Sequence, residues 1–381
     1  MPFMEENNNL IRVCNIFIHP SHYRENIYKK LDATFLCRFV FSNEQLKIKT
    51  FDTSVLKYVD TCKIHTIGKI QFQCGLLKYV FQNFNYYLVN ANINNISSWM
   101  FFIFLKCIPR KKTYLWVHGL YGSETRRQIF IRKLYYRLVD GLFLYGEYGK
   151  KILIENGINE NKLFVLHNSL NYEEQLELRN TVTKTQVYKE RFGNTNPVIV
   201  MIGRLNKRKK MDYLLESLSS LKSKGLLYNL VVIGDGEYRK TLENRITDYN
   251  LNDQVWMYGA CYDELVNAQL IYNADLCVVP GDVGLTAIHS MMFGVPVITH
   301  NYYPSQGPEF EAIRNGVTGA FYEYNDVSSL TNCIQCWFEA NSNKRDMVRK
   351  ACFEIIDKEW TPNYQLEEFK KVFTNKLINE K

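Results

Sequence analysis

Short apolar runs alternate with longer segments of helical periodicity along most of the chain. In the first half, the runs that predict strands are Val13–Ile18, Phe35–Phe41, Tyr86–Asn90, Tyr114–His118, Gly141–Tyr145 and Leu163–Leu166. Between two of them, Arg126–Val139 has the period of a helix. This alternation predicts an α/β domain.

The second half repeats the pattern with short connections. Its predicted strands are Val198–Ile202, Asn229–Ile233, Gln254–Tyr258, Leu276–Val279 and Val295–Thr299. Its predicted helices are Met211–Lys224, Tyr238–Tyr249, Asp263–Ala274 and Thr286–Phe293. Strands and helices in strict alternation predict a mostly parallel sheet covered by helices on both faces.

A polar and charged stretch separates the two halves. It runs from Tyr172 to Asn196 and ends in the turn-forming GNTNP of Gly193–Pro197. With 381 residues the chain fits two domains better than one. We therefore expect an N-terminal domain at 1–185, a C-terminal domain at 186–360, and a C-terminal helix within 361–381 that packs back on the N-terminal domain.

Composition is that of a soluble globular protein, with 46% hydrophobic and 23% charged residues. The apolar run Trp99–Leu105 is too short to span a bilayer and predicts a buried strand or helix. The ten cysteines are irregularly spaced, which favours reduced thiols over a disulfide framework or structural zinc. The N-terminus MPFMEENNNL lacks the pattern of an export leader, so we expect a cytoplasmic protein.

A formal net charge of +8 favours an anionic partner: nucleic acid, a membrane surface or a phosphorylated substrate. No helix-turn-helix, finger or RNA-binding motif is present, so nucleic acid is not expected. The stretch Ile108–Arg137 mixes many basic residues with aromatics. It is either a face for peripheral attachment to an anionic membrane or an ordinary solvated helix face.

Ligands of open parallel sheets bind beyond the carboxyl ends of the strands, so the strand exits are the candidate sites. The first exit of the second half carries Gly203 and Arg204 and then a basic run that includes Lys209. Glycine allows close backbone approach, and the cations can offer paired charge to a diphosphate; the alternative is a solvated basic loop. The second exit, the GDG beginning at Gly234, opens a helix and suits an anion or a tight turn.

The richest exit is Pro280–Thr286, which leads directly into a helix. Gly281 and Gly284 allow backbone N–H groups to face a phosphate. Thr286 adds a hydroxyl donor or an N-cap. His289 lies near the first helical turn, where it either reaches the same ligand or is a packed helix residue.

From Val198 to Asp326 these motifs, in order, resemble the C-terminal domain of the two-domain retaining glycosyltransferases of family 4 (group 1), which have the GT-B architecture. The matching pieces are VIVMIGRLNKRKKMDYLLESL, NLVVIGDGEYRKTLE, YNADLCVVPGDVGLTAIHSMMFGVPVIT and EFEAIRNGVTGAFYEYND. The resemblance implies an α/β fold of two Rossmann-like domains facing a central cleft. It also implies a nucleotide-sugar donor bound mainly by the C-terminal half.

Carried over residue by residue, the resemblance implies that Arg204 and Lys209 bind the donor diphosphate and that Gly284 and Leu285 give it backbone N–H groups. Glu311 falls at the family's acidic residue before the NG turn. Two family glutamates are replaced, by Gly281 and His289. The first of them contacts the donor sugar and the second the ribose; Gly281 cannot supply a carboxylate, and His289 has no fixed negative charge.

The resemblance is weaker in the first half. There WVHG at Trp116–Gly119 resembles the strand-end histidine of the family, which would place His118 near the reacting sugar as the candidate catalytic residue. A core histidine is the alternative. The first strand exits into HPSHYR, where His22 and Arg24 either meet acceptor or donor phosphates or belong to a surface loop.

The resulting hypothesis is a retaining hexosyltransferase that moves a sugar from a UDP- or GDP-sugar to a saccharide or polyprenyl-diphosphate-linked acceptor. By family, it would serve bacterial surface polysaccharide synthesis in the cytoplasm, as a peripheral protein of the inner membrane face. No DxD motif occurs, so neither a metal nor another cofactor is expected. A sugar-nucleotide epimerase of the same fold and a non-catalytic nucleotide-binding subunit are the alternatives.

Overall fold

The structure is a computed structural model that describes residues 11–42, 49–90 and 92–378. The decapeptide MPFMEENNNL, from which we expected no export leader, lies outside these residues. The chain divides into two compact units. Unit 1 comprises residues 1–171 and 362–381, and unit 2 comprises residues 172–361.

The division after residue 171 lies earlier than the boundary at 185/186 that the polar stretch suggested. That stretch is not an open linker, because it forms α5 (Tyr172–Thr181) and α6 (Val187–Phe192). Both helices are tied to α9 (Glu264–Asn273) of unit 2. Gln175 Nε2 donates to Glu264 Oε1 at 2.7 Å, and Tyr188 Oη donates to the Leu270 carbonyl at 2.6 Å. Polar composition here reflects exposed helix faces.

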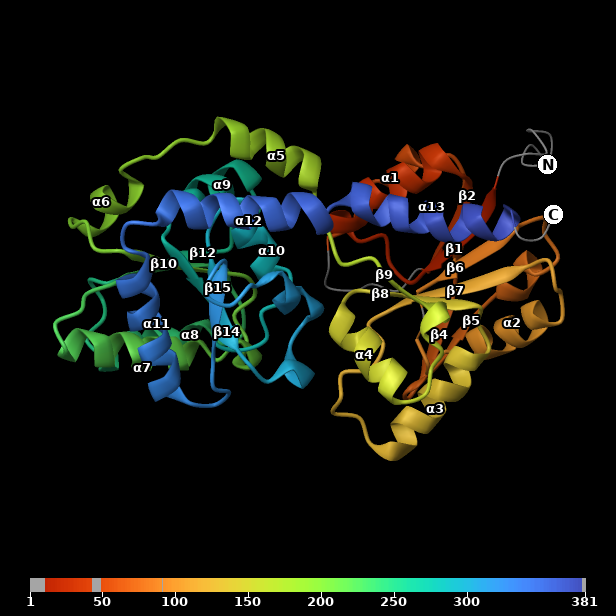
Figure 1. The fold of residues 1–381 in the computed structure, drawn as a ribbon, viewed down its shortest axis with the longest axis horizontal. Coiled ribbons are helices and arrows are strands. Elements are labelled where there is room, and N and C mark those ends of the chain that lie inside the picture. The colour runs from red at the N-terminus through yellow and green to blue at the C-terminus, as the bar shows by residue number, and fades with distance from the viewer. Residues whose placement is uncertain (1–10, 43–48, 91, 379–381) are drawn as a thin grey trace. The chain divides into compact units, whose positions relative to one another are not determined.

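Among the described residues, unit 1 is built on a seven-stranded parallel sheet in the order β3-β2-β1-β6-β7-β8-β9. Figure 1 labels β2, β1, β6, β7, β8 and β9 of this sheet. Its strands are β1 (Arg12–Phe17), β2 (Leu36–Ser42), β3 (Val59–Cys62), β6 (Tyr86–Val89), β7 (Lys112–Val117), β8 (Gly141–Leu144) and β9 (Leu163–Val165). A small antiparallel pair, β4 (Ile64–Ile67) and β5 (Ile70–Gln73), stands apart from this sheet. The strand order changes direction between β1 and β6, which is where Rossmann-like sheets bind ligands.

Helices cover both faces of this sheet. They are α1 (Glu25–Thr34), α2 (Ile96–Lys106), α3 (Arg126–Arg137), α4 (Glu147–Glu155) and α13 (Pro362–Ile378). The run Trp99–Leu105 lies in α2, so it is a helix and not a strand. The C-terminal α13 packs on the aromatic face of the sheet, where the ring of Phe369 lies 4.5 Å from that of Phe143 and Phe373 lies 4.6 Å from Tyr86. The chain thus returns to unit 1 at its end.

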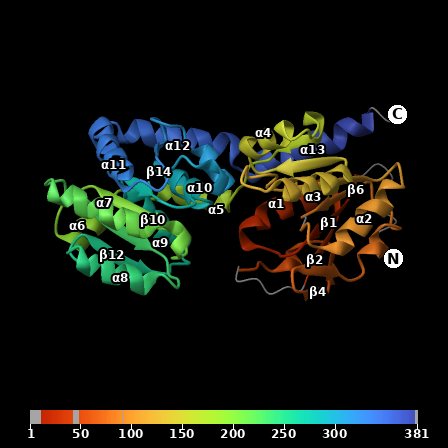
Figure 2. The ribbon, with the colours of Figure 1, turned by 90° about the horizontal axis from the view of Figure 1, so that it is seen from below.

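The described part of unit 2 has a six-stranded parallel sheet in the order β12-β11-β10-β13-β14-β15. Its strands are β10 (Val198–Ile202), β11 (Asn229–Ile233), β12 (Val255–Gly259), β13 (Leu276–Val278), β14 (Val297–His300) and β15 (Gly319–Tyr322). The remaining helices are α7 (Met211–Ser223), α8 (Arg239–Asp248), α10 (Thr286–Met292), α11 (Val327–Asn341) and α12 (Arg345–Glu359). Figure 2 shows β12 and α8 toward one side of this unit and α11 toward the other.

Numbered within unit 2, the strand order is 3-2-1-4-5-6, that of a dinucleotide-binding sheet. Every strand and helix predicted for this half is present, with ends that differ by a residue or two. The α/β fold class of two Rossmann-like units is confirmed. In unit 2 the order changes direction between β10 and β13, so the loops after these two strands are the candidate site.

Candidate functional site

The loops after β10 and β13 meet through their backbones. The Gly281 N–H donates to the Lys209 carbonyl at 2.9 Å. A Cβ on residue 281 would lie 1.8 Å from the Arg208 carbonyl oxygen, a distance that no side chain can occupy. Gly281 is therefore required by the close approach of the two loops. This explains why the position cannot hold the glutamate that the family resemblance leads one to expect.

The loops after β10 and β11 also touch. Gly234 has φ +154°, and a Cβ there would lie 1.9 Å from the Gly203 carbonyl oxygen. Gly203 itself has φ +139°. The loops at the carboxyl ends of β10, β11 and β13 thus lie so close together that no side chain fits at Gly234 or Gly281.

Thr286 connects α10 to this edge of the sheet, and of the two roles expected for it, hydroxyl donor or N-cap, it is not the N-cap. Leu285 is the N-cap residue of α10, without a side-chain bond to the helix. The Thr286 hydroxyl instead donates to the Ile202 carbonyl at the end of β10, at 2.8 Å. This hydroxyl fixes the start of α10 against the site.

The cations of the basic run differ in their surroundings. Lys209 is largely buried; its Nζ donates to the Asp282 carbonyl at 2.5 Å and lies 3.7 Å from Asp282 Oδ1. Burial lowers the pKa of Lys209 below its ordinary value, while the Asp282 carboxylate acts in the opposite direction. Arg208 pairs with the other carboxylate oxygen of Asp282 at 2.7 Å, and Arg204 is exposed. Asp282, which the sequence analysis did not single out, organises two of these cations.

The loop before α10 is fixed from the neighbouring strand. The Val283 N–H donates to Gln306 Oε1 at 2.8 Å, and Gln306 Nε2 donates to Thr299 Oγ1 at 2.9 Å. Gly284 has φ +54°, and no atom lies within 4 Å of the place that its Cβ would take. The bonds through Gln306 therefore fix the loop that contains the Gly284–Leu285 segment, while the space beside Gly284 is empty. A backbone that binds an anion needs both features.

His289 has a carboxylate partner that the sequence analysis missed. Its Nε2 lies 2.8 Å from Glu264 Oε1, and both side chains are mostly buried. Burial alone would raise the pKa of Glu264, but His289, Gln175 and Asn267 outweigh that effect and hold the pKa below its ordinary value. Glu264 comes from α9, in a region where we expected only a helix, so nothing in the local sequence marks it. Where the family has a glutamate, this chain has a histidine paired with a carboxylate from another helix.

Two acidic residues follow Gly307, and the sequence analysis named only the second of them, Glu311. Glu309 is buried, and its Oε2 lies 2.8 Å from where a Cβ of Gly307 would stand, next to the backbone of Gly284. Its charge also acts on Lys209. Glu311, the predicted residue, is partly exposed, and its carbonyl accepts a bond from Arg314.

Unit 1 has a cavity of about 520 Å³ at its own change of strand direction. Ile18 follows β1, Asn90 and Asn92 follow β6, His118 follows β7 and Tyr145 follows β8, so the carboxyl ends of four strands contribute to its wall. Arg24 and Arg132 are the basic side chains among the lining residues. A cavity with asparagines, aromatics and two cations suits a polar, anionic or hydroxyl-rich ligand.

Of the two predicted residues His22 and Arg24, only Arg24 lines the cavity. The Arg24 guanidinium lies 4.8 Å from the centre of the Trp116 ring and donates to the Tyr145 hydroxyl, which places it in the cavity wall. His22 is exposed and faces the Lys49 carbonyl at 3.2 Å. It is absent from the described residues that line the cavity.

His118 contacts Tyr145 and Tyr121, with ring centres at 4.5 and 5.7 Å. Part of its surface is open to the cavity, but protein surrounds the rest of the ring. Although the side chain is exposed to the cavity, the surrounding protein removes part of the water that would solvate a charged ring, and this loss of solvation, together with the charges of Arg24 and Arg132, lowers the pKa of His118 to about 4. The imidazole is therefore neutral at physiological pH and offers one hydrogen-bond donor and one acceptor.

We expect the ring protons of His118 to keep a constant chemical shift from pH 8 to about pH 5.5 and to titrate only near pH 4, because protonation would place a third positive charge beside two arginines. Histidine-resolved NMR, with His118→Gln to assign the signal, measures this. The same shift affects the free energy of unfolding. In the unfolded chain the imidazole takes up a proton near pH 6.5, whereas in the folded protein it does so only near pH 4, so His118 lowers the stability of the folded state as the pH falls from 6.5 to 4. A titration midpoint of His118 at or above pH 6.5 would contradict its position in the cavity beside Arg24 and Arg132.

No group of three or more His, Cys, Asp or Glu side chains that could hold a metal occurs within the described ranges. Cys333 and Cys336 on α11 are spaced as C-x-x-C but belong to no such group. All ten cysteines are described, and none is paired in a disulfide. Over the same ranges, no helix has both the length and the apolar character needed to cross a bilayer.

Comparison with known proteins agrees with this geometry. Residues 182–352 match the family model of glycosyl transferases group 1. The chain is 24% identical over 255 residues to an uncharacterized 41.2 kDa protein in the cps region of Klebsiella pneumoniae, covering 64% of each protein. It is 28% identical to the capsular polysaccharide biosynthesis glycosyltransferase CapM of Staphylococcus aureus, covering 49% of this chain and 48% of CapM. These alignments thus span less than two thirds of each relative.

The fold of the whole chain has solved counterparts. The crystal structure of Anabaena Alr3699/HepE in complex with UDP matches it with a TM-score of 0.75 and 15% identity, covering 96% of this chain and 100% of that one. At this identity the likeness establishes the fold alone. Residues 182–352 thus match the group 1 glycosyltransferases in sequence, and the chain as a whole has the GT-B fold of its solved counterparts.

Proposed function

We propose that the chain transfers a sugar from a nucleoside-diphosphate sugar to a glycan or lipid-linked saccharide in bacterial surface polysaccharide synthesis. The observation that supports this most is the meeting of the loops after β10 and β13 at the switch point of unit 2, which brings Lys209 to the loop of the open Gly284–Leu285 backbone; the exposed Arg204 follows the same strand, β10. The names of CapM and of the Klebsiella cps-region protein support the pathway.

For the donor we propose a UDP-sugar first and a GDP-sugar second. Alr3699/HepE was crystallised with UDP and with UDP-glucose, whereas a relative from Mycolicibacterium smegmatis is named as GDP-mannose-dependent. Arg204 and Lys209 would neutralise the diphosphate, and the Gly284–Leu285 segment would give it backbone N–H groups. Glu264, by way of His289, would supply the negative charge that suits ribose hydroxyls.

The proposed reaction retains the anomeric configuration and needs no metal. The bond between the anomeric carbon and the phosphate oxygen breaks, and the acceptor hydroxyl oxygen bonds to that carbon. The acceptor proton passes to the leaving phosphate oxygen, so no protein base is required. Charge on the departing diphosphate is stabilised by the fixed cations and N–H groups. His118, neutral in its cavity, would orient sugar hydroxyls, and Arg24 would recognise the acceptor.

A panel of UDP-, GDP- and ADP-sugars tests this proposal, with release of the nucleotide diphosphate measured in EDTA. We expect turnover with one nucleotide class when saccharide acceptors are added, and no loss of rate in EDTA. Release or isomerisation of the sugar without an acceptor would favour the epimerase. Nucleotide binding without any turnover would favour the non-catalytic subunit, to which the replaced glutamates also point. A rate abolished by EDTA would overturn the metal-independent mechanism.

We further propose that unit 1 attaches to an anionic membrane surface, where a polyprenyl-diphosphate-linked acceptor would be presented. The helices α2 and α3 are neighbours, because the Trp99 and Tyr135 rings lie 4.8 Å apart. Their exposed apolar side chains are Ile96, Met100, Ile103, Phe104, Phe130, Ile131 and Leu134. Exposed basic residues accompany them at Lys106, Arg110, Arg126, Arg127 and Arg137. Apolar and basic groups on one pair of helices match an interfacial surface.

Replacing Phe130 and Ile131 by serine should weaken binding to phosphatidylglycerol-containing vesicles about tenfold, because two large apolar side chains leave the interface. Vesicle co-sedimentation measures this. Leu265→Ser, at an exposed apolar position of unit 2, is the matched control and should have no effect. Binding to purely zwitterionic vesicles should be much weaker. Equal binding to both kinds of vesicle, or no effect of the double substitution, would contradict this surface.

A further inference from the structure

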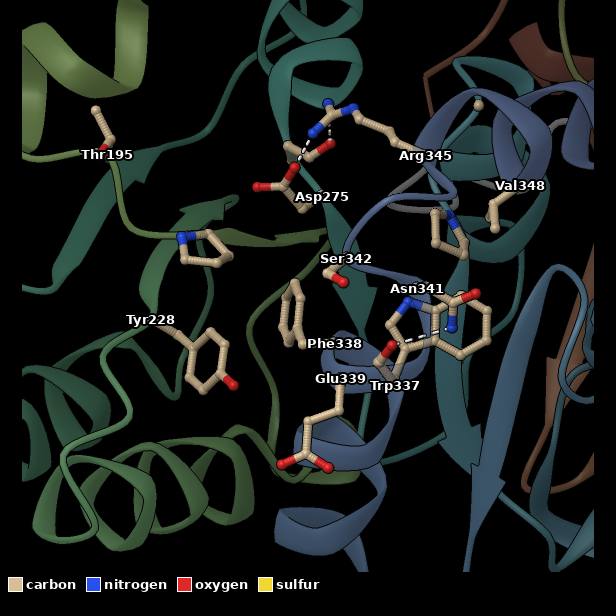
Figure 3. Close-up of a pocket in the computed structure, with 14 residues that line it drawn as sticks. Thr195, Tyr228, Asp275, Trp337, Phe338, Glu339, Asn341, Ser342, Arg345 and Val348 are labelled. Atoms are coloured by element: carbon tan, nitrogen blue, oxygen red, sulfur yellow. Dashed lines mark hydrogen bonds and ion pairs between the residues drawn. The ribbon is translucent and has the colours of Figure 1, made fainter.

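We propose that unit 2 carries a second binding site, for a neutral saccharide, at the amino ends of its strands. This edge of the sheet is opposite the edge where the donor residues converge. The site is a cavity of about 430 Å³ (Figure 3). That volume lies within the range of about 300–1,000 Å³ found for small-molecule sites. A ligand there cannot touch the candidate donor residues, so the site is separate from the transfer site.

The position of the cavity follows from the topology. Pro197 precedes β10, Asp275 precedes β13 and Pro296 precedes β14, and all three line the cavity. Neither proline has a backbone N–H. The end of α11 and the start of α12 close the other side. The wall is therefore set by firmly placed strand starts and two helix ends.

An aromatic wall dominates one side of this cavity. Tyr228 and Phe338 are stacked, with ring centres 4.6 Å apart and an interplanar angle of 21°. Trp337 is buried in the same wall, while Phe338 is partly exposed. An aromatic face carries partial negative charge, and the C–H groups on one face of a pyranose ring carry partial positive charge. A partly open aromatic ring with rigid support behind it is suited to stack on a sugar.

Polar groups surround the aromatic wall at the mouth. Glu339 and Ser342 from the end of α11 are exposed beside Phe338, and Thr195 is exposed across from them (Figure 3). A carboxylate and two hydroxyls can bond to the hydroxyl groups that project from the edge of a sugar ring. An apolar floor with a few polar groups around it is the usual form of a specific small-molecule site.

The charges of the cavity argue for a neutral ligand. Among the described residues that line it, Arg345 is the basic one. Its guanidinium is already paired with Asp275 and donates to the carbonyls of Ala274 at 2.8 Å and Tyr272 at 3.1 Å. A phosphate or nucleotide would thus meet Glu339 and find no cation left to bind it. An uncharged molecule rich in hydroxyls fits these groups.

Binding of neutral disaccharides, measured by saturation-transfer NMR with saturating UDP present, tests the proposal. The probes are disaccharides of glucose, galactose, mannose and N-acetylglucosamine, used at concentrations above about 1 mM, where weak saccharide sites saturate. We expect saturable binding of at least one disaccharide. Phe338→Ala should raise its Kd at least tenfold. Ser342→Trp, which fills the mouth from an exposed position and spares the core, should do the same.

Tyr262→Ala, at an aromatic residue of unit 2 that is 85% exposed, is the matched control and should leave the Kd within twofold. UDP affinity should be equal in all variants, which separates this test from that of the donor site. Absence of saturable binding by every disaccharide, or binding that persists unchanged in Ser342→Trp, would overturn the proposal. Failure of the unmodified protein to bind either UDP or GDP, with saccharide binding intact, would instead count against the proposed transfer function.

Discussion

Gly281→Ala is expected to lower the free energy of unfolding by about 3 kcal/mol or more, because the added Cβ would stand 1.8 Å from the Arg208 carbonyl oxygen. The obstacle is backbone and cannot rotate away. The loop 206–210 would have to move, and with it Lys209 and the bond between the Gly281 N–H and the Lys209 carbonyl. Denaturant unfolding measures the stability, and nucleotide binding should weaken in parallel.

Gly284→Ala is the matched control for stability. It lies in the same loop and has φ +54°, but no atom is within 4 Å of its Cβ position. The only cost is that of a left-handed backbone on a residue with a side chain, about 1 kcal/mol. Should the two substitutions destabilise the protein equally, the close approach of the loops after β10 and β13 would not be present in solution.

The second large effect is expected for Arg204→Ala, which should lower kcat/KM for the donor about 10²-fold, the usual consequence of removing one preorganised donor from a developing negative charge. Because Arg204 is exposed, its loss should change the free energy of unfolding by less than about 0.5 kcal/mol. Activity and stability would therefore separate. Steady-state kinetics with the active nucleotide sugar, together with denaturant unfolding, measures both.

Lys207→Ala controls for charge alone, since Lys207 is an exposed cation of the same basic run. Its kcat/KM should stay within about threefold of the unmodified protein, as expected for a solvated surface charge. If Lys207→Ala and Arg204→Ala lowered kcat/KM by the same factor, the basic run would attract the donor only through its total positive charge. The alternative of a solvated basic loop would then be the better account.

Hydrophobic periodicity was sufficient to predict most of the fold. In unit 2 the strands β10, β11, β13 and β14 are wholly buried, and such apolar runs, bounded by Gly, Pro and Asn, are readily identified as strands. The helix expected at Asp263–Ala274 begins as its sequence suggests, because the Asp263 carboxylate accepts from the N–H groups of Leu265 and Val266. Composition did not locate the end of unit 1, because the polar stretch Tyr172–Asn196 contains exposed helix faces that have the same polarity as a linker.

Parts of the candidate site could be predicted where the backbone geometry requires glycine, because glycine is visible in the sequence. Glycines after β10, β11 and β13 indicated the strand exits as candidate sites, and at Gly234 and Gly281 a Cβ would meet a backbone carbonyl oxygen of the neighbouring loop, at 1.9 and 1.8 Å. Glu264 left no such mark, because a carboxylate in an amphipathic helix is common and its pairing with His289 arises only when α9 packs beside α10. Asp282 was missed for the same reason: its role depends on two cations contributed by another loop.

Calorimetric titration with UDP and GDP, in EDTA, of the unmodified protein and of the Arg204→Ala/Lys209→Ala double variant tests the central claim most directly. The account predicts that one of the two nucleotides binds saturably without a divalent metal and that its Kd rises at least a hundredfold in the double variant, since two cations leave the diphosphate. Failure of both nucleotides to bind, or equal affinity in the two proteins, would contradict a donor site at the switch point of unit 2.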